Sequence, residues 1–195
     1  MMYRTIKRLF DIAASLSALV VLAPLFVALV ILIKLDSKGP AFFVQERMGY
    51  KGKVFKIAKF RSMVQGADTM NYPVEQVRKW EAEGRGDPRV TRVGAWLRTT
   101  GVDEFPQLFN VLKGDISLVG PRPYYLKRMD SDPELQERLS VKPGFVSLAL
   151  ANGGVHLTED DIKKYDREYI EQQSLWLDLK ILLKVAYLVV SRKGF

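Results

Sequence analysis

The sequence predicts an α+β fold that is mainly helical, with a long apolar N-terminal helix ahead of a small mixed domain. Three observations lead to this prediction: a run without charged residues between Asp11 and Lys34, two short segments with strand-like alternation, and later segments with apolar residues at helical spacing. The composition changes at Gly39 and Pro40. We therefore expect a membrane segment at residues 1–38 and a folded domain at residues 39–195.

Composition excludes several classes of protein. The chain has 195 residues, 48% of them hydrophobic, which is too apolar for a disordered protein and long enough for one domain or a domain with an appendage. It has no cysteine, which excludes disulfide scaffolds, thiol nucleophiles and cysteine metal sites. The single histidine, His156, cannot form a His-rich metal site. The net charge of +8 favours a phosphate-bearing partner: nucleic acid, anionic lipid or a phosphorylated small molecule.

The uncharged run indicates a membrane segment. It is longer than the apolar core of a signal peptide, and the residues after it contain no small-x-small cleavage site. Pro24 interrupts it and predicts a kink, because proline cannot donate the helical hydrogen bond. Basic residues flank both ends, and the positive-inside rule then favours both ends on one side. Hydropathy leaves two arrangements open, a kinked span and a re-entrant hairpin.

The domain after Pro40 contains strand-like and helix-like segments. Alternation predicts strands at residues 42–45 and 54–60. Helices are expected at residues 74–83, 93–98, 104–113, 158–173 and 175–192. Asp103 and Thr158 are the expected N-caps of the third and fourth helices, and Gly114 is expected to end the third. The last helix is apolar over most of its surface, which fits either the membrane interface or packing on the core.

Two adjacent acids are candidate catalytic residues. Asp103 and Glu104 precede Pro106 at the expected start of a helix. Alone, this pattern is typical of a helix cap, because acids favour helix N-termini. The functional interpretation is that a carboxylate there stays ionised, can bind Mg²⁺ and can act as a nucleophile at phosphorus.

Basic residues form the candidate phosphate-binding groups. In Gly120-Pro121-Arg122-Pro123 the two prolines stiffen the backbone around Arg122, which suits bidentate phosphate binding; a rigid surface turn is the structural alternative. Alternation places Lys59 and Arg61 on one face of a strand, where a solvated strand edge is the alternative. Arg98 adds a cation before the acids. Together these groups suggest phosphoryl transfer at a membrane.

Four segments resemble the bacterial monotopic phosphoglycosyl transferases, and the resemblance covers nearly the whole chain. They read VDEFPQLFNVLKGDISLVGPRP (102–123), DPRVTRVGAWLR (87–98), KFRSM (59–63) and LWLDLKILLK (175–184). The chain is similar to the small form of that family, without an additional N-terminal domain. The resemblance implies a helix-break-helix re-entrant hairpin with its kink at Pro24. It also implies a catalytic domain with a C-terminal interfacial helix, and an active site at the cytoplasmic face of the bacterial inner membrane.

The resemblance also implies a reaction. A UDP-sugar would give its phosphosugar to undecaprenyl phosphate and release UMP, as the first membrane step of surface glycan synthesis such as exopolysaccharide. Asp103 would form a covalent aspartyl phosphosugar, Glu104 would assist, and Asp103 would also be a ligand of Mg²⁺. Lys59, Arg98 and Arg122 would bind substrate phosphate. No nucleic acid partner is expected. Membrane lipids are expected partners, and a homodimer is plausible for an enzyme at a membrane surface.

The sequence departs from the family pattern at two places. Ala23-Pro24 replaces the common Ser-Pro, which removes a hydroxyl that could satisfy a freed carbonyl. Residues 141–154 read VKPGFVSLALANGG where many relatives read RPGITGLAQVNGR, and this predicts altered donor binding. Two other functions therefore stay open: a catalytically silent scaffold of the same family, and a basic peripheral protein that only binds anionic lipid.

Overall fold

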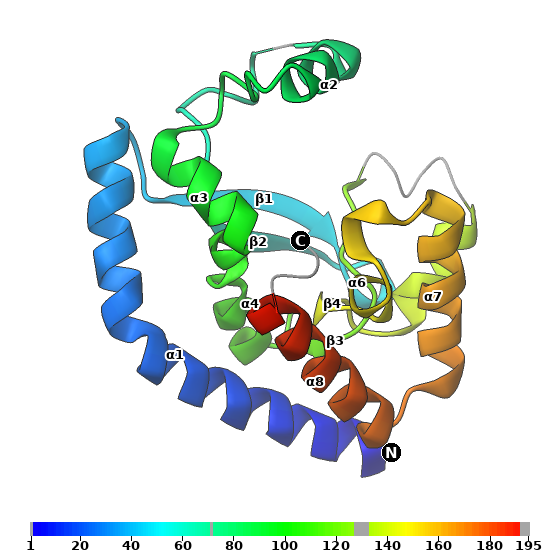
Figure 1. The fold of residues 1–195 in the computed structure, drawn as a ribbon. Helices are drawn as coiled ribbons and strands as arrows, with labels where there is room; N and C mark the ends of the chain where they lie inside the picture. Colours follow the sequence, from blue (N-terminus) through cyan, green and yellow to red (C-terminus); the bar gives the residue numbers. More distant parts are fainter. Residues whose placement is uncertain (1, 71, 127–132, 192–195) are drawn as a thin grey trace. The chain divides into compact units, whose positions relative to one another are not determined.

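The computed structural model describes residues 2–70, 72–126 and 133–191, and Figure 1 shows their ribbon. The α-helices are α1 (Met2–Asp36), α2 (Val74–Ala82), α3 (Arg92–Thr100), α4 (Gln107–Lys113), α6 (Leu148–Ala151), α7 (Glu159–Gln172) and α8 (Leu175–Ser191). The strands are β1 (Phe42–Met48), β2 (Val54–Phe60), β3 (Ser117–Val119) and β4 (Gly144–Val146). The 3-10 helices are η1 (Tyr50–Gly52), η2 (Val102–Glu104), η3 (Pro133–Ser140) and η4 (Gly154–His156). The prediction of a mainly helical fold with small sheets is confirmed.

Most predicted elements have a counterpart. β1 and β2 pair in one two-stranded sheet, as the alternation indicates. Thr158 caps α7 with a reciprocal capping box, in which its Oγ1 accepts from the Asp161 N–H at 3.2 Å and Asp161 Oδ2 accepts from the Thr158 N–H at 3.1 Å. The predicted end of the last helix, Arg192, lies outside the described residues.

Helix α1 is the predicted long apolar helix. It runs for 35 residues and is long and apolar enough to cross a membrane by length and composition. Many of its large apolar side chains are exposed, among them Leu16, Val20 and Val21. The chain is helical on both sides of Pro24 and at Pro24 itself. The helix-break-helix hairpin is thus not confirmed and stays a prediction.

The chain divides into two compact units, which we describe separately. Unit 1 comprises residues 1–21, 44–58 and 106–195, and unit 2 comprises residues 22–43 and 59–105. In unit 1, β3 pairs in parallel with β4, with Ser117 opposite Gly144 and Val119 opposite Val146. A Cβ on Gly144 would lie 2.1 Å from the Gly120 nitrogen, so glycine is required for this close approach. The second sheet was not predicted, because three residues are too few to show alternation.

Two buried aspartates connect α1 to the core of unit 1. Asp11 accepts from Ser117 Oγ at 2.8 Å and from the Leu118 N–H at 3.1 Å. Asp178 of α8 accepts from Tyr3 Oη at 3.0 Å and Lys7 Nζ at 2.7 Å. Its Oδ1 lies 2.8 Å from the hydroxyl of Tyr169, so its two oxygens are both used. Buried carboxylates need such partners, and here the partners lie far apart in the sequence.

Helix α8 has two apolar faces. Ile181 and Val185 are buried, so one face packs on the core of unit 1. Trp176, Leu183 and Tyr187 are each more than 60% exposed, so another face is apolar and open to the surroundings. The interpretation of packing on the core therefore fits the face with Ile181 and Val185. The interpretation of a membrane interface concerns the exposed apolar face and stays a prediction.

Polar side chains, rather than only apolar ones, fix α4 to β2. The buried Asn110 donates to the Lys56 carbonyl at 2.7 Å, accepts from the Ala58 N–H at 3.1 Å and donates to Asp115 at 3.1 Å. Its amide thereby pairs with the backbone of β2 as a neighbouring strand would. Phe109, which helical spacing places among the apolar side chains of this helix, is 49% exposed.

In unit 2 an aromatic core surrounds the end of β2. The Phe60 ring is 1% exposed and lies 5.0 Å from the Phe26 ring and 5.3 Å from the Phe42 ring, measured between centroids. Gly94 of α3 packs against the Ser62 backbone, and a Cβ there would lie 1.9 Å from the Ser62 carbonyl oxygen. These contacts hold α3 and β2 in one unit.

The interpretation of Arg61 as a phosphate-facing neighbour of Lys59 is wrong. Arg61 is buried, and its guanidinium donates to the carbonyls of Ile33, Ser37 and Lys38 at 2.7–3.2 Å. These carbonyls lie at the C-terminal end of α1, where the helix backbone has no N–H donors left for them and where the helix attracts positive charge. Arg61 is therefore a C-terminal capping residue.

We expect Asn110→Ala to destabilise the protein by about 2 kcal/mol or more, because the backbone N–H of Ala58 and the carbonyl of Lys56 would lose their buried partner. Thermal unfolding in detergent measures the effect. Lys113→Ala on the same helix is the control, since Lys113 is 72% exposed and its pair with Asp115 is long, at 3.6 Å. Equal melting temperatures for the two variants would contradict this role for Asn110.

Candidate active site

The adjacent acids lie in a tight turn between α3 and α4. Helix α3 ends at Gly101, whose φ of 68° lies in the left-handed region that favours glycine. The chain then forms η2, in which the Glu104 N–H donates to the Gly101 carbonyl at 3.2 Å. Asp103 and Glu104 are both half-buried in this turn. The turn holds two carboxylates next to each other at the end of unit 2.

The prediction that Asp103 caps a helix starting at Glu104 is wrong. Helix α4 begins at Gln107, and its N-cap is Pro106. The acids lie instead in the 3-10 helix η2, which the Phe105 N–H closes by donating to the Val102 carbonyl at 3.1 Å. The predicted end is confirmed, because Gly114 is the C-cap with a φ of 89°. Pro106, rather than an acid, therefore occupies the N-cap position of α4.

Lys59 and Glu104 meet in an ion pair. Lys59 Nζ donates to Glu104 Oε1 at 2.6 Å, and the two side chains are 21% and 17% exposed. Lys59 is the next-to-last residue of β2, beside the fully packed Phe60, so the strand fixes the position from which its side chain extends. Strand alternation predicted a basic face here, and the structure adds its acidic partner.

Arg98 belongs to the same unit and lies in the last turn of α3. Its side chain is exposed, and its carbonyl accepts from the Gly101 N–H at 3.4 Å. Its charge contributes to lowering the pKa of Asp87, after the larger effect of the hydrogen bond that Arg89 donates to that carboxyl. Arg98 thus adds positive potential to the surface of unit 2 just before the turn that carries the acids.

Arg122 lies in unit 1, in an extended segment held by its neighbours. Its side chain is exposed, whereas Pro121 and Pro123 are buried. Stacking fixes the residues that follow: the Arg47 guanidinium lies 3.4 Å from the Tyr125 ring centroid, and the Arg138 guanidinium lies 3.8 Å from that of Tyr124.

The arginines that stack on Tyr124 and Tyr125 were missed by the sequence analysis. Arg138 is itself buried and forms an ion pair with Asp166. Cation–π contacts between residues far apart in the sequence leave no local pattern, so no signal was present to find them. The rigidity expected from the prolines around Arg122 is thus reinforced by tertiary contacts.

The residues of the turn fit a magnesium ion by their chemistry. Among the described residues, no three acidic or histidine side chains come together as a metal-binding group. Mg²⁺ does not require one, because it is commonly held by one or two carboxylates with water and substrate phosphate completing its shell. Asp103 and Glu104 supply such carboxylates, and Glu104 already has a cationic partner.

The segment that departs from the family pattern has a defined structure. Ser147 is the N-cap of α6, and its Oγ accepts from the Leu150 N–H at 3.0 Å. Gly153 and Gly154 both have positive φ, at 143° and 54°. The serine and the last glycine thus have structural reasons for their presence, and the effect on donor binding stays a prediction.

Comparisons with known proteins give a consistent result. The model of the family described as bacterial sugar transferase matches residues 2–192. The chain is 40% identical, over 97% of its length, to an undecaprenyl-phosphate glucose phosphotransferase of Komagataeibacter xylinus, and it covers 37% of that protein. It is 39% identical, over 98% of its length, to an undecaprenyl-phosphate galactose phosphotransferase of Salmonella typhimurium, and it covers 42% of that protein.

A shorter relative matches from end to end. The chain is 38% identical to an exopolysaccharide production protein of Rhizobium leguminosarum, over 97% of this chain and 98% of that protein. The chain spans about two fifths of the length of the two relatives named before it.

We expect a double-mutant cycle of Lys59→Met and Glu104→Gln to give a coupling free energy of about 1 kcal/mol or more, because the pair is shielded from solvent on both sides. Chemical denaturation in detergent measures it. The control is the cycle Arg85→Met and Glu83→Gln in the same unit, whose side chains are 63% and 38% exposed and should couple weakly. A coupling near zero for Lys59 and Glu104 would contradict the inferred strength of the contact.

Proposed function

Because this chain belongs to the bacterial sugar transferase family, whose members include phosphoglycosyl transferases, we propose that it transfers a sugar 1-phosphate from a UDP-sugar to undecaprenyl phosphate. The single observation that supports the proposal best is the turn after α3, where Asp103 lies next to a Glu104 that is already paired with Lys59. This pairing gives Glu104 a fixed cation directly beside the second carboxylate of the turn.

The first step of the proposed reaction forms a covalent intermediate. A carboxylate oxygen of Asp103 attacks the β-phosphorus of the UDP-sugar. A new bond forms between that oxygen and phosphorus, the bond from phosphorus to the bridging oxygen breaks, and UMP leaves with the electron pair. Two anions must approach each other here, so cations are required. Lys59, Arg98 and Arg122 are the residues proposed to bind the phosphates.

The second step releases the product. A phosphate oxygen of undecaprenyl phosphate attacks the same phosphorus, the bond to Asp103 breaks, and the carboxylate is regenerated with the polyprenyl diphosphate sugar as product. Where the attacking phosphate carries a proton, Glu104 accepts it. Lys59 donates to Glu104 Oε1 and so holds this carboxylate in place.

Asp103, assisted by Glu104, is proposed to hold Mg²⁺. The bound ion would supply positive charge to the diphosphate of the donor. The two carboxylates of η2 are the donor set that supports this proposal.

The proposed setting is the cytoplasmic face of the bacterial inner membrane. The apolar exposed surface of α1 and the basic residues at both of its ends support a re-entrant arrangement around Pro24. The exposed apolar face of α8 supports contact with the membrane interface, since Lys180 lies 5.2 Å from the Trp176 ring centroid, at the border of that face. The proposed product is a lipid-linked sugar for surface glycan synthesis.

We expect Asp103→Asn to reduce UMP release by at least about a hundredfold, because the amide is a poor nucleophile at phosphorus. The assay uses full-length protein in detergent, undecaprenyl phosphate, Mg²⁺ and a panel of UDP-sugars. Without acceptor, intact-protein mass spectrometry should show a phosphosugar adduct on the wild-type chain and none on the variant. Asp160→Asn, an exposed position in α7, is the matched control.

Two results would count against the proposal in different ways. Transfer by Asp103→Asn at the wild-type rate would exclude this residue as the nucleophile. Inactivity of folded wild-type protein across the panel, beside an active control enzyme, would favour the catalytically silent scaffold.

A further inference from the structure

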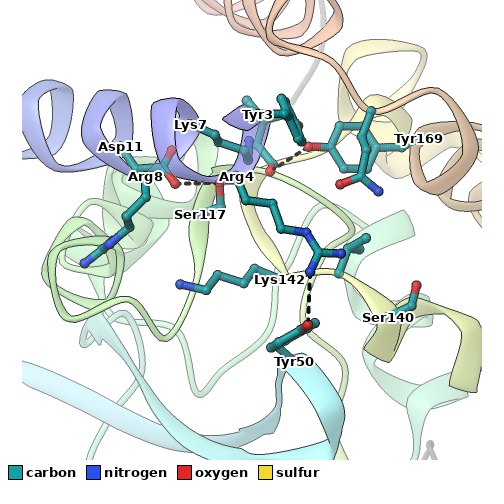
Figure 2. A pocket seen from close by; sticks show the side chains of 13 residues that line it. Tyr3, Arg4, Lys7, Arg8, Asp11, Tyr50, Ser117, Ser140, Lys142 and Tyr169 are labelled. Carbon is teal, nitrogen blue, oxygen red and sulfur yellow. Dashed lines mark hydrogen bonds between the residues drawn. The ribbon is translucent and has the colours of Figure 1, made fainter. Parts of the chain in front are cut away.

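A cavity of about 120 Å³ lies in unit 1 beside the beginning of α1 (Figure 2). Helix α1 provides one wall with Arg4, Lys7 and Arg8, and the segment before β4 provides Lys142. None of the residues proposed for sugar-phosphate transfer lines this cavity. Its lining contains four cationic side chains and one carboxylate, that of Asp11.

The carboxylate and two of the four cations have structural partners. Asp11 is used by Ser117 and by the backbone of β3. Lys7 forms an ion pair with Asp178 at 2.7 Å. Arg8 donates to the Val111 carbonyl at 2.5 Å and to the Leu112 carbonyl at 2.6 Å, at the C-terminal end of α4. These contacts explain three of the five charges by the fold alone.

Arg4 and Lys142 are not explained in this way. Arg4 donates to the neutral hydroxyl of Tyr50 at 3.4 Å, a long hydrogen bond that does not balance its charge. Lys142 is half-buried and makes no hydrogen bond or ion pair within the described part of the chain. A lysine at this depth would ordinarily have an acceptor for its ammonium group.

The surroundings of Lys142 disfavour its charge further. A Cβ on Gly114 would lie 3.2 Å from Arg8 Nη2 and 3.5 Å from Lys142 Nζ. The Arg8 and Lys142 side chains therefore both end close to Gly114. Burial, and after it the charge of Arg8, lower the pKa of Lys142. Figure 2 shows the Arg4 guanidinium directed at Tyr50 and the Lys142 side chain extending toward the Arg8 side of the cavity. An anion bound beside Lys142 would neutralise its ammonium group.

We propose that this cavity binds the phosphate group of an anionic lipid headgroup, with Lys142 and Arg4 as its direct contacts. The lining carries four cationic side chains, and this suits phosphate, whose oxygens accept several hydrogen bonds. The lipid source follows from position, because the cavity wall formed by α1 continues directly into the exposed apolar part of the same helix. Only this choice of source rests on the membrane association proposed above.

Isothermal titration of the full chain in dodecyl maltoside tests the proposal. The probes are dihexanoyl phosphatidylglycerol, dihexanoyl phosphatidylcholine and inorganic phosphate. We expect the anionic lipid to bind at least about tenfold more tightly than the zwitterionic one, and Lys142→Gln and Arg4→Gln each to weaken it at least about fivefold. Lys53→Gln, an exposed lysine that does not line the cavity, should bind as the wild type does.

The outcomes separate the cavity from the transfer reaction. We expect Lys59→Gln to bind the anionic lipid as the wild type does. Because the titration contains no sugar donor, its result does not depend on whether the proposed transfer reaction occurs. Equal binding of both lipids, or equal binding by Lys142→Gln and Lys53→Gln, would overturn the proposal. If inorganic phosphate bound more tightly than the lipid, and Lys142→Gln weakened its binding equally, the site would be supported. Its ligand would then be a free phosphate rather than a lipid headgroup.

Discussion

The ion pair between Lys59 and Glu104 is the contact on which the arrangement of the acidic turn depends. It connects the end of β2 to η2 and gives one of two adjacent carboxylates a fixed cation. The surrounding unit keeps both partners in place: Phe60 packs among aromatic rings beside Lys59, and Arg61 connects the strand to the end of α1. Mutual repulsion between Asp103 and Glu104 is thereby reduced where the chain holds them together.

Local patterns predicted those elements whose cause is local. Charge-free length, alternation and an N-cap threonine before an amphipathic segment indicated α1, β1, β2 and α7. The parallel pair β3 and β4 is too short to show a period. The predicted start of α4 was wrong because residues 102–104 form a separate 3-10 turn, and an acid is as suitable there as at the N-cap of an α-helix. Asn110 was missed because a buried amide that pairs with a strand does not differ in sequence from a surface one.

The candidate site divides in the same way. Adjacency in the sequence brought Asp103 and Glu104 together, and alternation placed Lys59 on the face of its strand opposite Phe60. Alternation could not predict that Arg61 contacts the C-terminal end of α1, because this contact depends on tertiary structure. The stacking of Arg47 and Arg138 near Arg122 depends on tertiary structure alone. The acidic residues of one turn could thus be predicted from the sequence, whereas the tertiary contacts that hold the site residues in place could not.

The contacts of Asp178 have a consequence for biosynthesis. Its partners Tyr3 and Lys7 are separated from it by 175 and 171 positions along the chain. At about 5–20 residues per second, translation reaches Asp178 roughly 10 to 35 s after those residues are made. During that interval the start of α1 has no acidic partner in α8, so a bilayer or a chaperone can engage the nascent helix first. Completion of unit 1 is therefore a late event in synthesis that depends on the C-terminal helix.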